Sequence, residues 1–289
     1  MDLNIAKLII SVKPDCFGEL VKKLAGSGRG FEQALRNAAC IHSGQVCETC
    51  VDADHCSFSA IAGRRLSTDP ELVRRHQRPG LPYLFSFPAE LYAESAFALT
   101  LLGPAIQHIP PIIEAIGSLG ETKPLVSAVD ICGTRTSGSS LPDLAELSIL
   151  SAADLFESAN FRYHGAKGLL LEIWSPVRLM QDGFEQGRLD PQLFIKAVIR
   201  RVSALAAYYG TAGDAEMFRG VASVAEQVRL ADFRPVFVPA HLARLRGVKG
   251  SCRLTGDFSL LGPLLELGSS LNLGKGAAYG QGCFRVSPQ

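Results

Sequence analysis

Hydrophobic residues along this chain are spaced either as in β-strands or as in amphipathic α-helices. The order of these segments predicts the order of the strands and helices. Residues 3–12 are mostly apolar and predict a strand, whereas the apolar positions of residues 31–39 fall on one face of a helix. Residues 84–102 alternate loosely and predict strands, residues 106–119 predict a helix, and residues 125–131 predict a further strand. Strand, helix, two strands, helix and strand is the order of a ferredoxin-like domain.

The second half of the chain repeats this order of elements without repeating its sequence. It predicts strands at 168–174, 236–238, 251–258 and 277–286, and helices at 193–209, 218–230 and 260–267. We therefore expect an α+β fold of two tandem ferredoxin-like (RRM-like) domains, residues 1–135 and 166–289. The acidic and apolar residues 136–165 predict a linker or a short helical insertion between them.

A glycine-rich segment precedes the last predicted strand. Residues 274–282 read Gly-Lys-Gly-Ala-Ala-Tyr-Gly-Gln-Gly. Glycine adopts positive φ and permits close backbone approach, and successive N–H groups in such a segment form a concavity that binds anions. The spacing matches neither the dinucleotide fingerprint nor a P-loop. A polymer of phosphates is the guest that this segment predicts, with a lysine for charge and a tyrosine ring for stacking. A glycine-rich turn without a ligand is the alternative.

Composition and charge bear on the class of protein and on whether this segment binds a polymer of phosphates. The chain has 289 residues, of which 47% are hydrophobic and 20% charged, so a packed core in two domains is expected. It contains no apolar run of membrane-spanning length and no signal-peptide pattern, which favours a cytosolic protein that does not contact a membrane. The formal net charge of +1 argues against a general nucleic-acid binder. Residues 244–289, however, carry six basic and two acidic side chains, which suits either a local phosphate track or a solvated face.

A second glycine-rich turn, residues 26–30, leads into the helix predicted at 31–39. It places Arg29 at the helix entry, where free N–H groups and the helix dipole favour an anion. Arg36 lies on the polar side of the same helix. A phosphate clamp is one interpretation of these arginines, and an ordinary surface position is an equally good one for Arg36.

The first domain carries a cysteine-rich insertion. Four of the eight cysteines occur in a short segment: Cys40, Cys47, Cys50 and Cys56. In a cytosolic chain this spacing predicts a metal site before it predicts disulfides, and zinc before an iron–sulfur cluster. His42 and His55 could replace a thiol, and reduced thiols without metal are the alternative. The site would be structural, because four thiolates leave no open coordination position.

The glycine-rich segment and its surroundings resemble the C-terminal signature of the CRISPR repeat-processing endoribonucleases of the RAMP superfamily. Earlier in the chain, further motifs occur in the same order as in this family, at residues 28–31, 82–87, 101–105 and 176–179. The resemblance implies metal-independent cleavage of the precursor CRISPR transcript within each repeat. In that reaction a ribose 2′-OH attacks the adjacent phosphate and leaves a 2′,3′-cyclic phosphate and a 5′-OH.

The resemblance also assigns roles to residues. Members of the family often use a histidine in or just after the first helix, and His42 lies at about that place. Some members lack this histidine and rely on the positive charge of arginine or lysine. In this chain Arg29 and Arg36 could take that role. The residues expected to bind RNA are those of the glycine-rich segment and nearby arginines: Gly274, Lys275, Gly276, Tyr279, Gly280, Gly282, Arg244, Arg246 and Arg253.

The partners implied by the resemblance are the precursor RNA, the mature guide RNA and other subunits of a CRISPR effector complex, with no cofactor for catalysis. Two alternatives stay open. One is a catalytically inactive RAMP-type subunit that binds guide RNA, and the other is a zinc-stabilised protein without an RNA function.

Overall fold

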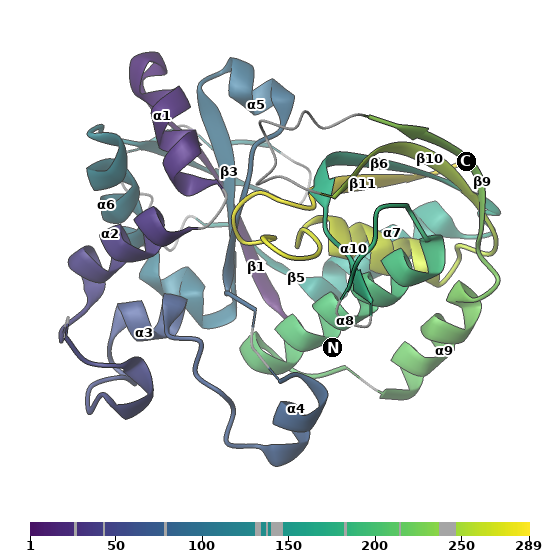
Figure 1. The fold of residues 1–289 in the computed structure, drawn as a ribbon, viewed down its shortest axis with the longest axis horizontal. Coiled ribbons are helices and arrows are strands. Elements are labelled where there is room, and N and C mark those ends of the chain that lie inside the picture. Colours follow the sequence, from purple (N-terminus) through teal and green to yellow (C-terminus); the bar gives the residue numbers. More distant parts are fainter. Residues whose placement is uncertain are drawn as a thin grey trace.

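The computed structural model places two lobes side by side, each built on one antiparallel sheet (Figure 1). The structure describes residues 1–25, 28–42, 44–77, 80–130, 134–136, 138–139, 147–181, 184–213, 215–236 and 247–289. In both lobes the helices cover one face of the sheet (Figure 1). This is the predicted pair of ferredoxin-like domains.

The first lobe has the strand order β2-β3-β1-β4. Its elements are β1 (Asn4–Ser11), α1 (Pro14–Leu24), α2 (Arg29–Ala39), β2 (Tyr83–Ser86), β3 (Ala96–Leu102), α6 (Ile109–Gly120) and β4 (Leu125–Val129). The strand β1 is buried on both faces. Leu8 and Ile10 pack in the core under α1, α2 and α6, whereas Leu3 and Ile5 belong to the core shared with the second lobe. Burial on both faces explains why residues 3–12 form a nearly continuous apolar run.

Helix α1 is one of the elements of this lobe that the sequence did not predict, because Pro14 and Gly18 interrupt the apolar pattern. Proline is tolerated in the first turn of a helix, and here Pro14 is the first helical residue. The helix then buries Phe17, Leu20 and Leu24 against the sheet. Between α2 and β2 the described chain forms η1 (Cys47–Thr49), α3 (Ser57–Ala62) and α4 (Pro70–Arg75); α5 (Ala89–Ala93) and η2 (Gly103–His108) flank β3.

The second lobe has the strand order β11-β6-β10-β9, again that of a ferredoxin-like sheet. Its elements are β6 (Gly168–Val177), α8 (Pro191–Tyr209), α9 (Ala215–Ala225), β9 (Arg229–Pro235), β10 (Val248–Thr255), α10 (Leu261–Ser269) and β11 (Phe284–Pro288). A short hairpin of β7 (Met180–Gln181) and β8 (Phe184–Glu185) lies between β6 and α8. The register pairs Cys252 of β10 with Leu171 of β6, and both side chains are buried.

The connection between the lobes contains β5 (Ile149–Ser151) and α7 (Ala152–Tyr163). Strand β5 pairs with β1, so part of the predicted linker joins the first sheet. Helix α7 packs against α10 of the second lobe. Helix α7 thus lies within residues 136–165, and the division of the chain into two domains and a linker stays a prediction.

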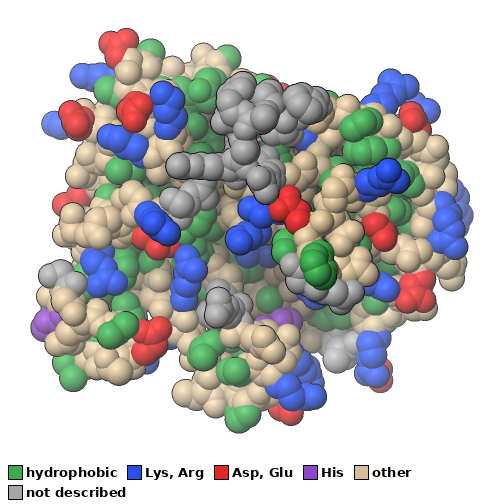
Figure 2. Space-filling model, viewed as in Figure 1, with side chains coloured by type: hydrophobic (Ala, Val, Ile, Leu, Met, Phe, Trp, Pro, Cys, Tyr) green, Lys and Arg blue, Asp and Glu red, His purple; other side chains and the backbone are tan. Residues whose placement is uncertain are grey.

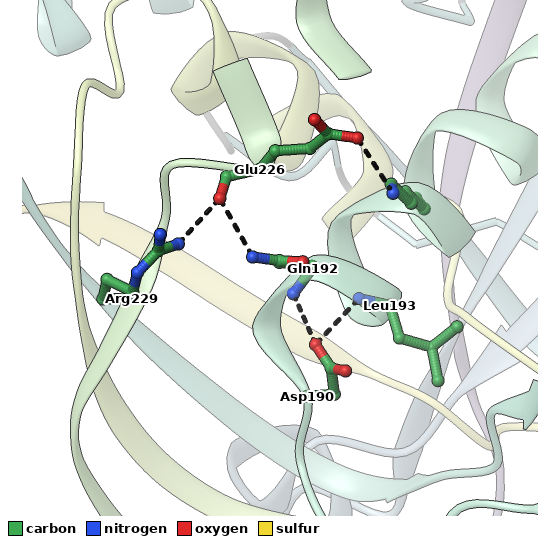
Figure 3. A network of polar contacts seen from close by, with 6 residues as sticks. Asp190, Gln192, Leu193, Glu226 and Arg229 are labelled. Carbon is green, nitrogen blue, oxygen red and sulfur yellow. Dashed lines mark hydrogen bonds and ion pairs between the residues drawn. The ribbon is translucent and has the colours of Figure 1, made fainter. Parts of the chain in front are cut away.

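Two boundaries differ from the sequence prediction around β9. The helix predicted at 218–230 ends at Ala225, and the strand predicted at 236–238 is instead β9, which ends at Pro235; residues 237–238 lie outside the described residues. Figure 3 shows what holds the turn. The carbonyl of Glu226 accepts bonds from Gln192 at 2.9 Å and from Arg229 at 2.7 Å, next to the Asp190 cap of α8. Because Gln192 of α8 and Arg229 of β9 both donate to this carbonyl, they stabilise the turn between α9 and β9.

The last strand also begins later than predicted. Strand β11 starts at Phe284 rather than at residue 277, because residues 277–283 remain part of the glycine-rich segment. Four glycines of residues 274–282 have positive φ, which a strand does not allow.

Candidate functional site

The glycine loop, residues 274–282, runs from α10 to β11 and contacts both lobes. Its four glycines have φ values of 83°, 86°, 84° and 69°, in the left-handed region. A Cβ at Gly282 would lie 1.8 Å from the carbonyl oxygen of Leu273, and one at Gly274 would lie 2.4 Å from that of Arg178. Only glycine fits these positions, so the path of the loop follows directly from its composition.

Hydrogen bonds fasten the loop to the first lobe at β2. The buried side chain of Asn272 donates to the carbonyls of Phe85 and Ala277 at 2.9 and 3.0 Å. The N–H of Phe85 in turn donates to the carbonyl of Ala278 at 3.0 Å. The loop thus extends the outer edge of the first sheet.

Hydrogen bonds also fasten the loop to the second lobe after β6. The N–H of Gly282 donates to the carbonyl of Pro176 at 3.0 Å, and that of Lys275 donates to Arg178 at 3.3 Å. In the described part of the chain, the N–H groups of Gly276 and Gly280 donate to no protein acceptor. Part of the predicted set of anion-binding amides is therefore used within the protein, and part is free for a ligand.

Tyr279 is buried where the loop meets helix α2. Its hydroxyl donates to the carboxylate of Glu32, and Arg64 donates to the same hydroxyl at 3.2 Å and to Glu32 at 2.8 Å. Burial, with the bond to Glu32, raises the pKa of Tyr279 to about 12, so its hydroxyl keeps the proton that it donates.

The ring of Tyr279 is enclosed by protein. It packs beside Tyr83, with 6.3 Å between ring centres, and a Cβ at Gly28 would overlap it. The stacking of an RNA base on this ring stays a prediction, and it would require the ring to leave this packing.

Helix α2 carries two of the predicted catalytic residues. Arg29 is exposed at its first residue, directly after Gly28, which has φ of 66°. Arg36 lies on the same side of the helix two turns later, roughly 10 Å along the axis. Its guanidinium lies 4.5 Å from the ring centre of Phe58 and donates to the carbonyl of Gln45 at 3.4 Å. Arg36 therefore contacts the cysteine-rich segment, whereas Arg29 lies near the glycine loop.

His42 follows the end of α2. Its Nε2 lies 2.6 Å from the carboxylate of Asp52, and its side chain is 39% exposed. A half-exposed imidazole with a carboxylate partner has the arrangement of a general acid or base. Because α2 lies between His42 and Arg29, at a length of roughly 15 Å, the structure does not bring all three predicted catalytic residues to one point.

The cysteine segment, residues 40–56, buries Cys47 and Cys56 and leaves Cys40 and Cys50 partly exposed. Burial raises the pKa of the Cys47 thiol. Among the described residues, which include these four cysteines, no three His, Cys, Asp or Glu side chains gather as ligands of a metal ion. The four thiols do not converge in this arrangement, and the zinc site stays a prediction.

The remaining predicted residues spread over the second lobe. Lys275 is exposed on the glycine loop, and Arg253 is exposed on β10. Arg244 and Arg246 lie outside the described residues. Figure 2 shows Lys and Arg side chains around the middle of the face where the glycine loop crosses between the lobes in Figure 1.

A cavity of about 1020 Å³ lies between the two sheets. Lys7 and Thr100 line it from the first sheet, Trp174 and Lys249 from the second, and Gly280 from the glycine loop. Lys7 and Trp174 were not predicted as site residues, and Lys249 was predicted only as one of the six basic side chains of residues 244–289. Their positions on strands were predictable, but which sheet faces oppose each other follows only from the packing of the two lobes.

The fold and the glycine loop define the class of the protein, which comparisons with known proteins make more specific. Two antiparallel sheets of ferredoxin-like order, with a glycine loop before the last strand, form a RAMP-type fold. A solved Cas6 described as a substrate mimic complex covers 98% of this chain and 99% of its own, with 12% identity and a TM-score of 0.53. A Cas6 product complex covers 98% and 99%, with 13% identity and a TM-score of 0.50.

A third solved structure, a partial Cas6-RT-Cas1–Cas2 complex, covers 99% of this chain at 12% identity with a TM-score of 0.55; the match spans 46% of that longer chain. At these identities the likeness shows the fold. No curated protein sequence matches the chain. No described helix is both long and apolar enough to cross a lipid bilayer.

Two family models match parts of the chain. Residues 171–284 match the model of the CRISPR-associated endoribonuclease Cas6, and residues 27–127 match a model described as an N-terminal domain. Over residues 171–284 the chain is therefore similar to the CRISPR-associated endoribonuclease Cas6, which agrees with the family that the sequence motifs predicted.

Proposed function

We propose that this protein cleaves precursor CRISPR RNA within its repeats without a metal ion and keeps the guide-containing product bound. The observation that carries the proposal is the position of the glycine loop. It is bonded to both lobes, has no acceptor among the described residues for the N–H groups of Gly276 and Gly280, and packs through Tyr279 on the residue before Arg29. An RNA phosphate at this loop would therefore meet free amides, Lys275 and the N-terminus of α2 together.

The proposed path of the RNA runs along α2 from the glycine loop toward the cysteine segment. Arg29 and Arg36 lie on one side of this helix, two turns apart, and His42 follows its end. Successive phosphates of an extended strand could follow such a row of charges. The glycine loop would hold the RNA, and His42 would act on the bond to be cleaved.

In the proposed reaction the 2′ oxygen forms a bond to the adjacent phosphorus as the bond from phosphorus to the 5′ oxygen breaks. The 2′-OH loses a proton, the leaving 5′ oxygen gains one, and a 2′,3′-cyclic phosphate and a 5′-OH result. His42, oriented by Asp52, would transfer a proton. Arginine would offset the charge of the phosphorane, and alignment of the attacking oxygen would supply much of the rate.

Cleavage of a repeat hairpin by purified protein in EDTA tests the proposal. We expect a single cut within the repeat and a product that ends in a 2′,3′-cyclic phosphate. Two controls detect contaminating nucleases: a His42→Ala variant purified in the same way, and a hairpin of scrambled sequence. Failure to cut or bind the hairpin, even at low ionic strength, would contradict the proposal.

A guide-binding subunit without catalytic activity is the second candidate. It is favoured by the separation of His42 and Arg36, which contact the cysteine segment, from the glycine loop. Tight binding of the repeat hairpin without any cut would support this candidate. For either function we propose further CRISPR proteins as partners, because two structures with a similar fold are complexes of Cas6-RT-Cas1 with Cas2.

A further inference from the structure

Arg64 has a backbone conformation that its residue type disfavours. Its φ is 50°, in the left-handed region, directly after helix α3 and Gly63. For a residue with a Cβ this conformation is unfavourable, and such strain persists where other contacts hold it. The neighbouring Arg65 is not among the non-glycine residues with positive φ.

Two contacts hold the side chain of Arg64. Its Nη2 donates at 2.8 Å to Glu32, in the first turn of α2, and at 3.2 Å to the hydroxyl of Tyr279, on the glycine loop. The hydroxyl of Tyr279 donates to the same oxygen of Glu32, which closes the three-way contact. One nitrogen of Arg64 therefore joins the helix to the loop.

The rest of the guanidinium is available. The side chain of Arg64 is 51% exposed, and its Nε and Nη1 donate to no protein acceptor in the described part of the chain. A guanidinium has five N–H donors in a planar fork that matches a phosphate, and here one corner of the fork is fixed. Arg29 is exposed one turn before Glu32 on the same helix.

We propose that Arg64 is a phosphate-binding residue of the RNA site, with Glu32 and Tyr279 as its positioning residues. This inference rests on the proposed RNA function and adds a specific residue. From the sequence, Arg64 was one of five arginines in residues 64–78, a basic stretch that could either touch RNA or be a solvated connector. It also gives Tyr279 a different role from stacking on a base: its hydroxyl orients Arg64. Glu32 offsets the charge of the arginine in the free protein and fixes the direction of its free N–H groups.

Arg64→Ala with Arg65→Ala as the matched control tests the assignment. Both variants lose one positive charge, but Arg65 bonds to Asp54 in the cysteine segment and is 44% exposed there. For Arg64→Ala we expect the dissociation constant of the repeat hairpin to rise about 10- to 30-fold, as for loss of a charge-assisted bond. For Arg65→Ala we expect a rise of about twofold or less. Equal effects of the two substitutions would overturn the inference.

Tyr279→Phe tests the positioning role, because it removes the hydroxyl and keeps the ring. In an otherwise wild-type protein we expect a rise of about threefold to tenfold in the dissociation constant, with an unchanged melting temperature. In an Arg64→Ala background we expect no further loss of binding, since the hydroxyl then has no arginine to orient. Additive losses would show that Tyr279 acts independently and would refute its positioning role.

Wild-type controls separate this inference from the proposed function. If the wild-type protein neither binds nor cuts repeat RNA, the proposed function fails and the assignment of Arg64 to an RNA site fails with it. If the wild-type protein binds and the Arg64 and Arg65 variants match it, only the assignment of Arg64 fails. Should Arg64→Ala not fold, Arg64→Lys retains the charge and loses the fork, and we expect it to bind about threefold to tenfold more weakly. Wild-type affinity of Arg64→Lys would contradict the geometry.

Discussion

The glycine loop and the cysteine segment are both irregular, and both contain the residues that the sequence marks most strongly, yet the protein holds them in different ways. The loop is bonded to carbonyls of both lobes and buries Ala277, Ala278 and Tyr279. In the cysteine segment the backbone bonds of residues 46–55 reach only three residues back along the chain. Val46 and Val51 are 65% and 86% exposed there.

The difference shows that a glycine motif and a cysteine motif determine structure in different ways. The shape of the glycine loop follows from its own residues, because each glycine permits a positive φ that the surroundings require. The cysteine segment has no comparable cause of order in its backbone. A bound metal would provide one by cross-linking distant thiolates, and the side chains need not converge before it binds. The two regions should therefore respond to substitution in different ways.

Gly282→Ala should have the largest effect. A methyl group at this position would lie 1.8 Å from the carbonyl oxygen of Leu273, on a backbone with φ of 69°. The strain and the steric overlap should lower the free energy of unfolding by roughly 3–5 kcal/mol. Urea denaturation followed by circular dichroism measures this change.

Gly220→Ala is the matched control for that prediction. A Cβ at Gly220, in helix α9, would meet no atom within 4 Å. We expect the substitution to raise the free energy of unfolding by roughly 0.5–1 kcal/mol, because alanine favours a helix more than glycine does. If both substitutions are tolerated equally, the loop is not fixed by its glycines and the contrast drawn above is wrong.

His42→Ala should separate cutting from binding. If the chemistry lies near the cysteine segment and the grip on RNA lies at the glycine loop, the single-turnover cleavage rate should fall by about 10²- to 10³-fold, as for loss of a general acid or base. The affinity for the repeat hairpin should change by less than about twofold. Rapid-quench cleavage and filter binding on the same preparation give the two numbers.

Asp52→Asn is the companion variant of His42→Ala. It keeps a side chain that can bond to the imidazole but removes the carboxylate charge. A cleavage rate reduced about tenfold would fit an orienting role. A His42→Ala protein that cuts at the wild-type rate would place the chemistry elsewhere, with the arginines of α2 as the remaining predicted residues.

The sequence predicted the order of elements well where a helix or strand buries one face. Helices α2 and α8 have clear apolar faces, and both were predicted to within a few residues. Strand β9 was misplaced because it lies at the edge of its sheet with mostly exposed side chains, which leaves no alternating pattern. Residues 277–279 were assigned to the last strand because they are apolar; in the folded protein they are buried by the loop instead.

The site was predictable where a role depends on backbone geometry and much less where it depends on side chains meeting in space. The glycine loop and the N-terminus of α2 were found from their motifs. Arg64 was part of an arginine-rich stretch, and no local pattern shows that it contacts Tyr279, 215 positions later. Arg36 was read as a candidate for phosphate, whereas its guanidinium covers the ring of Phe58.

Cys47→Ser tests whether the cysteine segment acquires order from a metal. We predict one zinc ion per chain in the wild-type protein, measured by elemental analysis, and its loss in the variant. Loss of the ion should lower the free energy of unfolding by roughly 2 kcal/mol or more, because the cysteine segment then has no cross-link. Cys16→Ser is the control, since Cys16 lies on α1 away from the segment. A wild-type protein that is free of zinc and iron, stable and active would refute the metal site.

Lys275→Ala should have the smallest effect and should fall on binding alone. The side chain of Lys275 is exposed on the glycine loop, so its substitution should leave the fold intact. If it contacts one phosphate, the slope of log affinity against log salt concentration should decrease by about 1, and affinity should fall roughly fivefold at moderate salt. Lys123→Ala, which removes an exposed lysine from the turn between α6 and β4, should leave the slope unchanged. A Lys275→Ala protein that binds normally and cuts poorly would reverse the roles assigned to the two regions, because the glycine loop would then serve the chemistry rather than the grip.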